Sequence, residues 1–171
     1  AVELAAKAIE LDGQNALALA TYGHLKSFLF HDYDSALTYF DRALAACPNH
    51  SLAWLLSSPT LSYIGRAEQA IRHAEQALRL SPLDRSLFYY FDILSLAHYA
   101  AGNYEEAVKW GRMGANENPR HAAHLRYLAA SYAAVDRLDE AQDAARGLMA
   151  MHPDFRLSVF ERTLQPFRNL P

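Results

Sequence analysis

The feature that most constrains this chain is a rhythm of about 34 residues that three unrelated sets of residues share. The first set consists of four prolines, with spacings of 34, 37 and 34 residues: Pro48, Pro82, Pro119 and Pro153. A set of alanines keeps the same spacings: Ala36, Ala70, Ala107 and Ala141. A third set, of mixed residue type, does so too: His31, Gly65, Gly102 and Asp136. An irregular rhythm repeated three times indicates internal repeats that stack on one another.

The residues between these markers favour helices. Alanine, leucine and tyrosine are plentiful, whereas β-branched residues, which lose rotamer freedom in a helix, are few. Each marker proline is expected to follow the end of a second helix, since proline cannot continue the hydrogen-bond ladder. We predict helices at 2–11, 16–30, 33–46, 51–63, 66–80, 86–101, 104–117, 120–134, 138–151 and 155–164. Small residues are expected where paired helices cross: Gly23, Ser58, Ser95 and Ala129 on first helices, and the marker alanines on second helices.

Local signals refine this pattern. Asn103 followed by Glu106 is typical of a capping box at the start of a second helix. Pro59 falls inside a first helix, where the missing N–H and a clash with the Leu55 carbonyl predict a kink. Residues 155–167 are expected to form a C-terminal helix that caps the last repeat and faces Leu148.

The period and the marker residues resemble the tetratricopeptide repeat (TPR), whose pattern is W-x2-L-G-x2-Y…A-x3-F…P. Residues 51–84 show the match through Trp54, Ser58, Leu61, Ala70 and Pro82. The resemblance implies an all-α, right-handed superhelical solenoid of antiparallel helix pairs. The chain would then be a single TPR domain, cut from a longer protein. Its segments would be a truncated repeat at 1–15, full repeats at 16–50, 51–84, 85–121 and 122–155, and a cap at 156–171.

Some longer strings resemble a narrower group. Residues 80–84 (LSPLD), 96–107 (LAHYAAGNYEEA) and 125–130 (LRYLAA) are similar to the C-terminal TPR regions of bacterial signalling proteins. In that group the repeats follow a class III adenylate or guanylate cyclase domain or a winged-helix DNA-binding domain. The resemblance implies a regulatory or scaffolding role in the bacterial cytoplasm, while neither output domain lies within these 171 residues.

Composition and motifs argue against several other functions. The 16 basic and 19 acidic residues give a net charge of −3, and no basic stripe suited to nucleic acid is present. The single cysteine, Cys47, excludes an intrachain disulfide, agrees with a cytoplasmic location, and is expected to be buried or half-buried. His24 and Lys26 interrupt the longest apolar stretch, so no membrane span is predicted. No phosphate-binding loop or nucleophile motif is present, so we predict neither an enzyme nor a cofactor.

Two other groups of residues have both a functional and a structural interpretation. His121 and His124 are three residues apart and could share a metal ion, but no carboxylate or cysteine stands beside them in sequence. The favoured interpretation is two surface histidines near an inter-repeat turn. Trp110 lies on one helix with Gly111 and Gly114, which favours a close helix crossing, with the indole on the surface, over a docking patch.

The first helices are expected to line a concave groove, and their residues supply the candidate binding site. Tyrosine and arginine are enriched where binding energy concentrates. The predicted groove residues are His24, Ser27, Leu55, Ser62, Tyr63, Tyr89, Asp92, Tyr99, Arg126 and Tyr127. The main hypothesis is a module that binds a protein, a peptide or another domain of its own chain. The alternative is a small-molecule sensor, and homodimerisation through the truncated N-terminal helix is a further expectation.

Overall fold

The computed structural model describes residues 1–158, which form nine α-helices and no strand. The helices are α1 (Val2–Leu11), α2 (Ala16–Phe30), α3 (Tyr33–Ala46), α4 (Ser51–Tyr63), α5 (Ala67–Leu80), α6 (Leu87–Ala100), α7 (Tyr104–Glu117), α8 (Ala123–Ala134) and α9 (Leu138–Met151). None of the helices in this range has the length and apolar character needed to cross a membrane. Of the helix predicted at 155–164, residues 155–158 are described, and the rest of the predicted cap lies outside the described residues.

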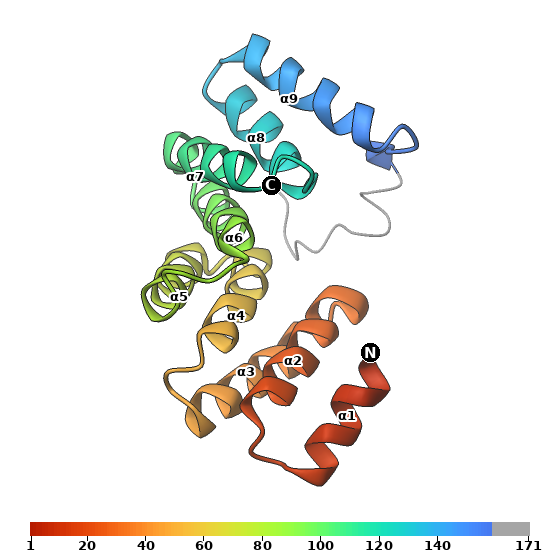
Figure 1. The fold of residues 1–171 in the computed structure, drawn as a ribbon, viewed down its shortest axis with the longest axis vertical. Helices are drawn as coiled ribbons and strands as arrows, with labels where there is room; N and C mark the ends of the chain where they lie inside the picture. Colours follow the sequence, from red (N-terminus) through yellow and green to blue (C-terminus); the bar gives the residue numbers. More distant parts are fainter. Residues whose placement is uncertain (159–171) are drawn as a thin grey trace. The chain divides into compact units, whose positions relative to one another are not determined.

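Contacts divide the described chain into two compact units, α1–α5 and α6–α9, with the boundary between Pro82 and Leu83. Within each unit a first helix packs on its own second helix and on the next first helix (Figure 1). In the first unit the pairs are α2 with α3 and α4 with α5, and α2 also contacts α4. In the second unit the pairs are α6 with α7 and α8 with α9, and α6 also contacts α8. The predicted helix-pair repeats are therefore confirmed within each unit, whereas the single-domain organisation stays a prediction.

The marker prolines end the second helices as predicted. The residue before each proline is the C-cap and lies outside the helical conformation, with φ of −146° at Cys47, −139° at Ser81, −141° at Asn118 and −132° at His152. A proline ring disfavours the helical conformation for the residue before it, which agrees with these helix ends. Cys47, in this position, is half-buried as expected.

The third marker set forms the turns inside the repeats. His31, Gly65, Gly102 and Asp136 have φ of 52°, 80°, 76° and 59°, the left-handed conformation that ends a helix tightly. Glycine adopts this conformation without a steric penalty, which accounts for its use at two of the four positions. The four residues differ in type but share one backbone requirement, a positive φ.

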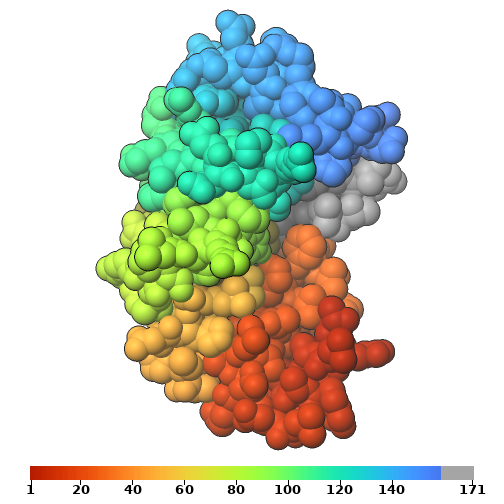
Figure 2. All heavy atoms as spheres, viewed as in Figure 1, coloured from red at the N-terminus to blue at the C-terminus, as the bar shows by residue number. Residues whose placement is uncertain are grey.

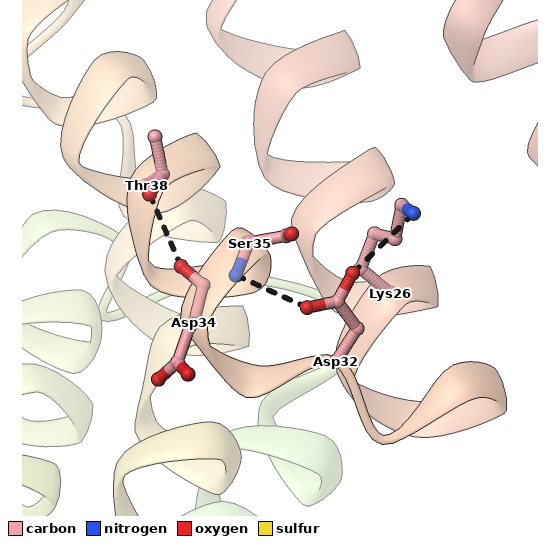
Figure 3. A network of polar contacts seen from close by, with 5 residues as sticks. All are labelled: Lys26, Asp32, Asp34, Ser35 and Thr38. Carbon is pink, nitrogen blue, oxygen red and sulfur yellow. Dashed lines mark hydrogen bonds and ion pairs between the residues drawn. The ribbon is translucent and has the colours of Figure 1, made fainter.

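The turn between α2 and α3 shows how side chains complete such a junction (Figure 3). The Ser35 backbone N–H donates to Asp32 Oδ1 over 3.3 Å, which caps α3. Lys26 Nζ, on α2, lies 3.5 Å from the other carboxylate oxygen of Asp32. Thr38 Oγ1 donates to the Asp34 carbonyl oxygen over 3.1 Å within α3. Asp32 therefore joins the end of one helix to the start of the next.

Paired helices cross closely at the small residues that the pattern predicted. Ser58 Oγ donates to the Ala70 carbonyl oxygen over 2.8 Å, and Ser95 Oγ donates to the Ala107 carbonyl oxygen over 2.8 Å. At the corresponding Gly23, an added Cβ would lie 3.0 Å from the Ala36 carbonyl oxygen.

Other details differ from the sequence-based predictions. Asn103 is the N-cap of α7, but its side chain makes no capping hydrogen bond, and Glu106 accepts instead from Lys109 Nζ over 2.9 Å. The predicted capping box is therefore wrong. Helix α8 begins at Ala123 and not at residue 120, because residues 119–122 form the inter-repeat turn. Pro59 lies inside α4, which continues through it to Tyr63, and the kink stays a prediction.

Candidate functional site

In the first unit, most of the predicted groove residues are buried. Ser27 is 1% exposed and accepts a hydrogen bond from Thr60 Oγ1 over 2.8 Å, between α2 and α4. Leu55 and Ser62 on α4 are also buried, so these three side chains serve packing and are closed to a guest in this conformation.

Two further predicted residues of this unit are aromatic. Tyr63 is 8% exposed, and its ring centre lies 6.5 Å from that of Tyr33. His24 is half-buried and stacks on Phe28 with a centroid distance of 5.9 Å. Of the predicted residues in the first unit, His24 is therefore the most accessible.

The second unit brings four of the predicted residues into one group. Tyr89 and Asp92 lie on α6, and Arg126 and Tyr127 lie on α8. Tyr89, Arg126 and Tyr127 are half-buried, and Asp92 is 2% exposed. The Arg126 guanidinium interacts electrostatically with the Asp92 carboxyl and with the Tyr127 phenol. Tyr127 in turn interacts with the Tyr89 phenol. Tyr99 lies elsewhere on α6, where its ring packs 5.5 Å from that of Tyr104.

The two histidines join this group, which the sequence analysis did not predict. His121 Nε2 lies 3.0 Å from Asp92 Oδ2, and His124 Nδ1 lies 3.8 Å from Asp92 Oδ1. The His121 side chain is 34% exposed and that of His124 only 1%. The prediction of two surface histidines is therefore wrong for His124, because the fold places a carboxylate from another repeat against them.

Gly114 on α7 makes room for this arrangement. An added Cβ at Gly114 would lie 2.9 Å from Asp92 Oδ1 and 3.3 Å from the Phe88 carbonyl oxygen. At Gly111, one turn earlier, it would lie 2.9 Å from Leu128 Cδ2. The predicted close crossing at these glycines is confirmed, and Trp110 beside them is half-buried and stacks on Phe91 with a centroid distance of 5.7 Å. The signal that could have revealed the site is a glycine at 114, where other second helices carry Ala43 or Ala77.

Burial governs the ionisation of this group. It raises the pKa of the Asp92 carboxyl to about 7, and the opposing effect of Arg126 is smaller. Burial, with the neighbouring His121, lowers the pKa of His124 to about 4, and burial with Arg126 also lowers the pKa of His121. At neutral pH the histidines are therefore largely neutral, and Asp92 is close to its midpoint.

The phenols complete the electrostatic description. Burial, then Tyr127 and Asp92, raise the pKa of Tyr89 to about 12, and burial raises the pKa of Tyr127 as well. Both hydroxyl groups are thus protonated hydrogen-bond donors across the physiological range. We call these six residues the Asp92 group: Tyr89, Asp92, His121, His124, Arg126 and Tyr127.

The chemistry of the Asp92 group suits recognition more than reaction. It offers a guanidinium, an imidazole and two phenols beside aromatic surface, a combination that hydrogen-bonds and packs against a guest. Among residues 1–158, no three histidine, cysteine, aspartate or glutamate side chains are arranged to hold a metal ion. Asp92, His121 and His124 are therefore not arranged as three ligands of one metal ion.

The helix pairs, the left-handed turns and the close crossings together define an all-α, TPR-like helical-repeat fold, as predicted. Solved structures agree with this class. A thermophilic TPR protein from Thermus thermophilus, TTC0263, is 23% identical, with a TM-score of 0.68 over 82% of this chain and 74% of that chain. PilF of Pseudomonas aeruginosa is 16% identical, with a TM-score of 0.72 over 86% of this chain and 65% of that chain.

A third similar structure is MamA, residues 41 to the end, from Desulfovibrio magneticus RS-1. It is 18% identical, with a TM-score of 0.69 over 89% of this chain and 84% of that chain. At these identities the likeness establishes the fold alone. No protein-family model and no curated protein matches the chain.

Proposed function

We propose that the chain is a protein- or peptide-interaction module that docks its partner on the α6 and α8 side of the second unit. The observation that carries the proposal is the Asp92 group, in which Tyr89, Arg126 and Tyr127 remain half-buried around a buried carboxyl. Tyrosine presents a large, rigid contact area at low entropic cost, and both tyrosine and arginine are enriched where binding energy concentrates. The helical-repeat fold supports the proposal because such repeats present extended binding surfaces.

The cellular setting belongs to the same proposal. The strings at 80–84, 96–107 and 125–130 resemble regulatory repeats of bacterial signalling proteins. On that basis the module is cytoplasmic and regulates an output domain, with a second protein or another domain of its own chain as the partner. We do not extend the proposal to a small-molecule sensor. Such a sensor encloses its ligand, whereas the depression of about 350 Å³ found on α7 is open and lined by charged groups such as Lys109 and Arg112.

Selection from a random peptide library displayed on phage tests the proposal, with the isotope-labelled chain used to map each selected peptide. We expect the amide signals of α6 and α8 to shift on titration. The double variant Tyr89→Ala, Arg126→Ala should weaken binding by about 2 kcal/mol or more, as for paired anchor residues. The matched control is Tyr104→Ala, Arg112→Ala, which removes the same two residue types from α7 of the same unit.

Two results would contradict the proposal. One is equal affinity of the selected peptides for the wild type and the Tyr89, Arg126 double variant. The other is a shift pattern confined to α7 and α9, the second helices of this unit. Circular dichroism of each variant shows whether it remains folded, so that a loss of folding is not mistaken for a loss of binding.

A further inference from the structure

The depression on α7 has a basic rim and an apolar floor. Its charged lining residues are Glu105, Lys109, Arg112 and Arg137, and its apolar ones are Val108 and Met113. Three of the charged residues are basic and one is acidic, whereas the whole chain has a net charge of −3. The depression is therefore a locally basic surface on an acidic chain. We call these six residues the α7 depression.

The α7 depression lies on the side of α7 that faces away from α6. Glu105, Lys109 and Arg112 follow one another at steps of four and three residues, so they share one side of the helix. Ala107 and Gly114, which cross α6 closely, lie about half a turn around α7 from that side. In the space-filling view the atoms of the α7 range, in green to teal, lie at the surface of the second unit (Figure 2). The α7 depression is therefore separate from the Asp92 group.

An arginine of the α7 depression reverses the charge that the earlier second helices carry at its position. Steps of 34 and 37 residues, the rhythm of the marker residues, lead from Asp41 on α3 to Glu75 on α5 and then to Arg112 on α7. All three side chains are exposed, so packing does not dictate their type. The helix pairs thus form with an acid at this position, and the arginine gives α7 a charge that the fold does not require.

The same arginine is the basic residue that an anionic guest reaches without breaking an existing pair. Lys109 Nζ lies 2.9 Å from Glu106 Oε2, and Arg137 Nη2 lies 2.6 Å from Glu140 Oε1. Arg112 forms no ion pair or hydrogen bond with residues 1–158, although its charge acts on Glu140 at longer range. A carboxylate bound beside Arg112 therefore adds a charge pair to this surface.

The floor of the α7 depression suits an apolar side chain. Val108 is 3% exposed and packs in a core cluster with residues of α8 and α9, which holds the floor in place. Met113 is 38% exposed, and its flexible thioether adapts to guests of different shape. An apolar side chain between carboxylates therefore matches both the floor and the rim.

The surroundings of the α7 depression favour a short peptide over a nucleic acid. The first turns of α7 and α9 place carboxylates next to the basic residues: Glu105, Glu106, Asp139 and Glu140. These carboxylates repel a continuous phosphate backbone, whereas a peptide brings its own carboxylates only to the basic residues.

We propose that the α7 depression docks an acidic peptide segment in which carboxylates flank one apolar side chain. The carboxylates pair with Arg112 and Lys109, and the apolar side chain packs on Met113 over Val108. This is a second interaction surface, and it does not depend on the Asp92 group.

A synthetic peptide, acetyl-GDDLDDG-amide, is the probe and is titrated into the isotope-labelled chain. We expect amide shifts centred on α7 and on the start of α9. The variant Lys109→Gln, Arg112→Gln should bind at least about threefold more weakly, since each exposed ion pair contributes modestly. The matched control is Arg72→Gln, Arg79→Gln, which removes two exposed basic residues from α5 and should bind as the wild type does. Circular dichroism shows whether each variant remains folded.

Changes in the probe leave the protein untouched. A peptide with asparagine in place of aspartate should lose measurable binding, and one with serine in place of leucine should bind at least about threefold more weakly. Undiminished binding of the asparagine peptide, or equal affinity of the Lys109, Arg112 variant, would overturn the proposal. So would an oligothymidylate that shifts the same amides at lower concentration, because the guest would then be a nucleic acid. Shifts confined to α6 and α8 would overturn this proposal and leave the one for the Asp92 group standing.

Discussion

The replacement Asp92→Asn tests the ionisation of the buried carboxyl on which the candidate site is built. Asparagine keeps the shape and cannot ionise. The pKa of Asp92 is about 7 in the folded chain against an ordinary value of 3.8, a difference of about 3. At 1.36 kcal/mol for each tenfold change, ionising Asp92 in the folded state costs about 4 kcal/mol relative to the unfolded state.

The sign follows from proton binding. Between pH 3.8 and about 7 the folded state holds the Asp92 proton and the unfolded state has released it. The stabilising contribution of this proton is therefore complete below pH 3.8 and is lost as the pH rises through 7. His124 acts in the opposite direction, because its pKa falls from 6.5 to about 4 on folding, so its contribution grows as the pH rises through that window. Both chains carry His124, so the difference between them reports on Asp92.

Urea unfolding at pH 5 and pH 8, followed by circular dichroism, measures this difference. We expect the free energy of unfolding of Asp92→Asn, relative to the wild type, to increase by about 2 to 3 kcal/mol between these two pH values. The matched control is Asp139→Asn, which makes the same substitution at an exposed aspartate of the same unit.

The opposite result would refute the reasoning. If Asp92 is ionised and paired with a protonated His121, across the 3.0 Å that separate their atoms, asparagine would remove a charge pair. The variant would then be less stable than the wild type at pH 7, and its disadvantage would shrink towards acid pH.

Three further substitutions test the repeat geometry, each by urea unfolding. Ser58→Ala should lower the free energy of unfolding by about 1 kcal/mol, because it removes the hydrogen bond to the Ala70 carbonyl. Gly23→Ala should lower it by about 1 to 3 kcal/mol, since the new Cβ would lie 3.0 Å from a backbone oxygen of α3. Gly65→Ala should lower it by about 1 to 2 kcal/mol, because alanine resists a φ of 80°. Gly13→Ala, with only one atom within 4 Å, is the control. Losses at the three sites no larger than in this control would contradict the geometry.

The helix boundaries could be predicted because the signals that set them are local. A proline disfavours the helical conformation for the preceding residue, and Cys47, Ser81, Asn118 and His152 each end a helix. The α8 start was misplaced by three residues because nothing local distinguishes the turn there: its N-cap is Ala122, which has no side-chain oxygen.

The candidate site was predicted only in part because it depends on contacts between repeats. Asp92 and His121 are far apart in sequence, and their meeting depends on the space left by Gly114. The alternation of residue types along α2 and α4 identified the side that carries Ser27 and Leu55. It did not show that these side chains are buried. Their burial depends on how closely neighbouring first helices approach, as the hydrogen bond from Thr60 to Ser27 shows.

The serine-to-carbonyl contacts at the helix crossings have a mechanical consequence. A shear force along the α4–α5 or α6–α7 pair must break a directed bond, from Ser58 or Ser95, before the helices can slide. At the corresponding crossing of α2 and α3, Gly23 has no hydroxyl, so it offers no such directed bond to the Ala36 carbonyl. Under tension the α2–α3 pair should therefore slip at a lower load than the α4–α5 and α6–α7 pairs.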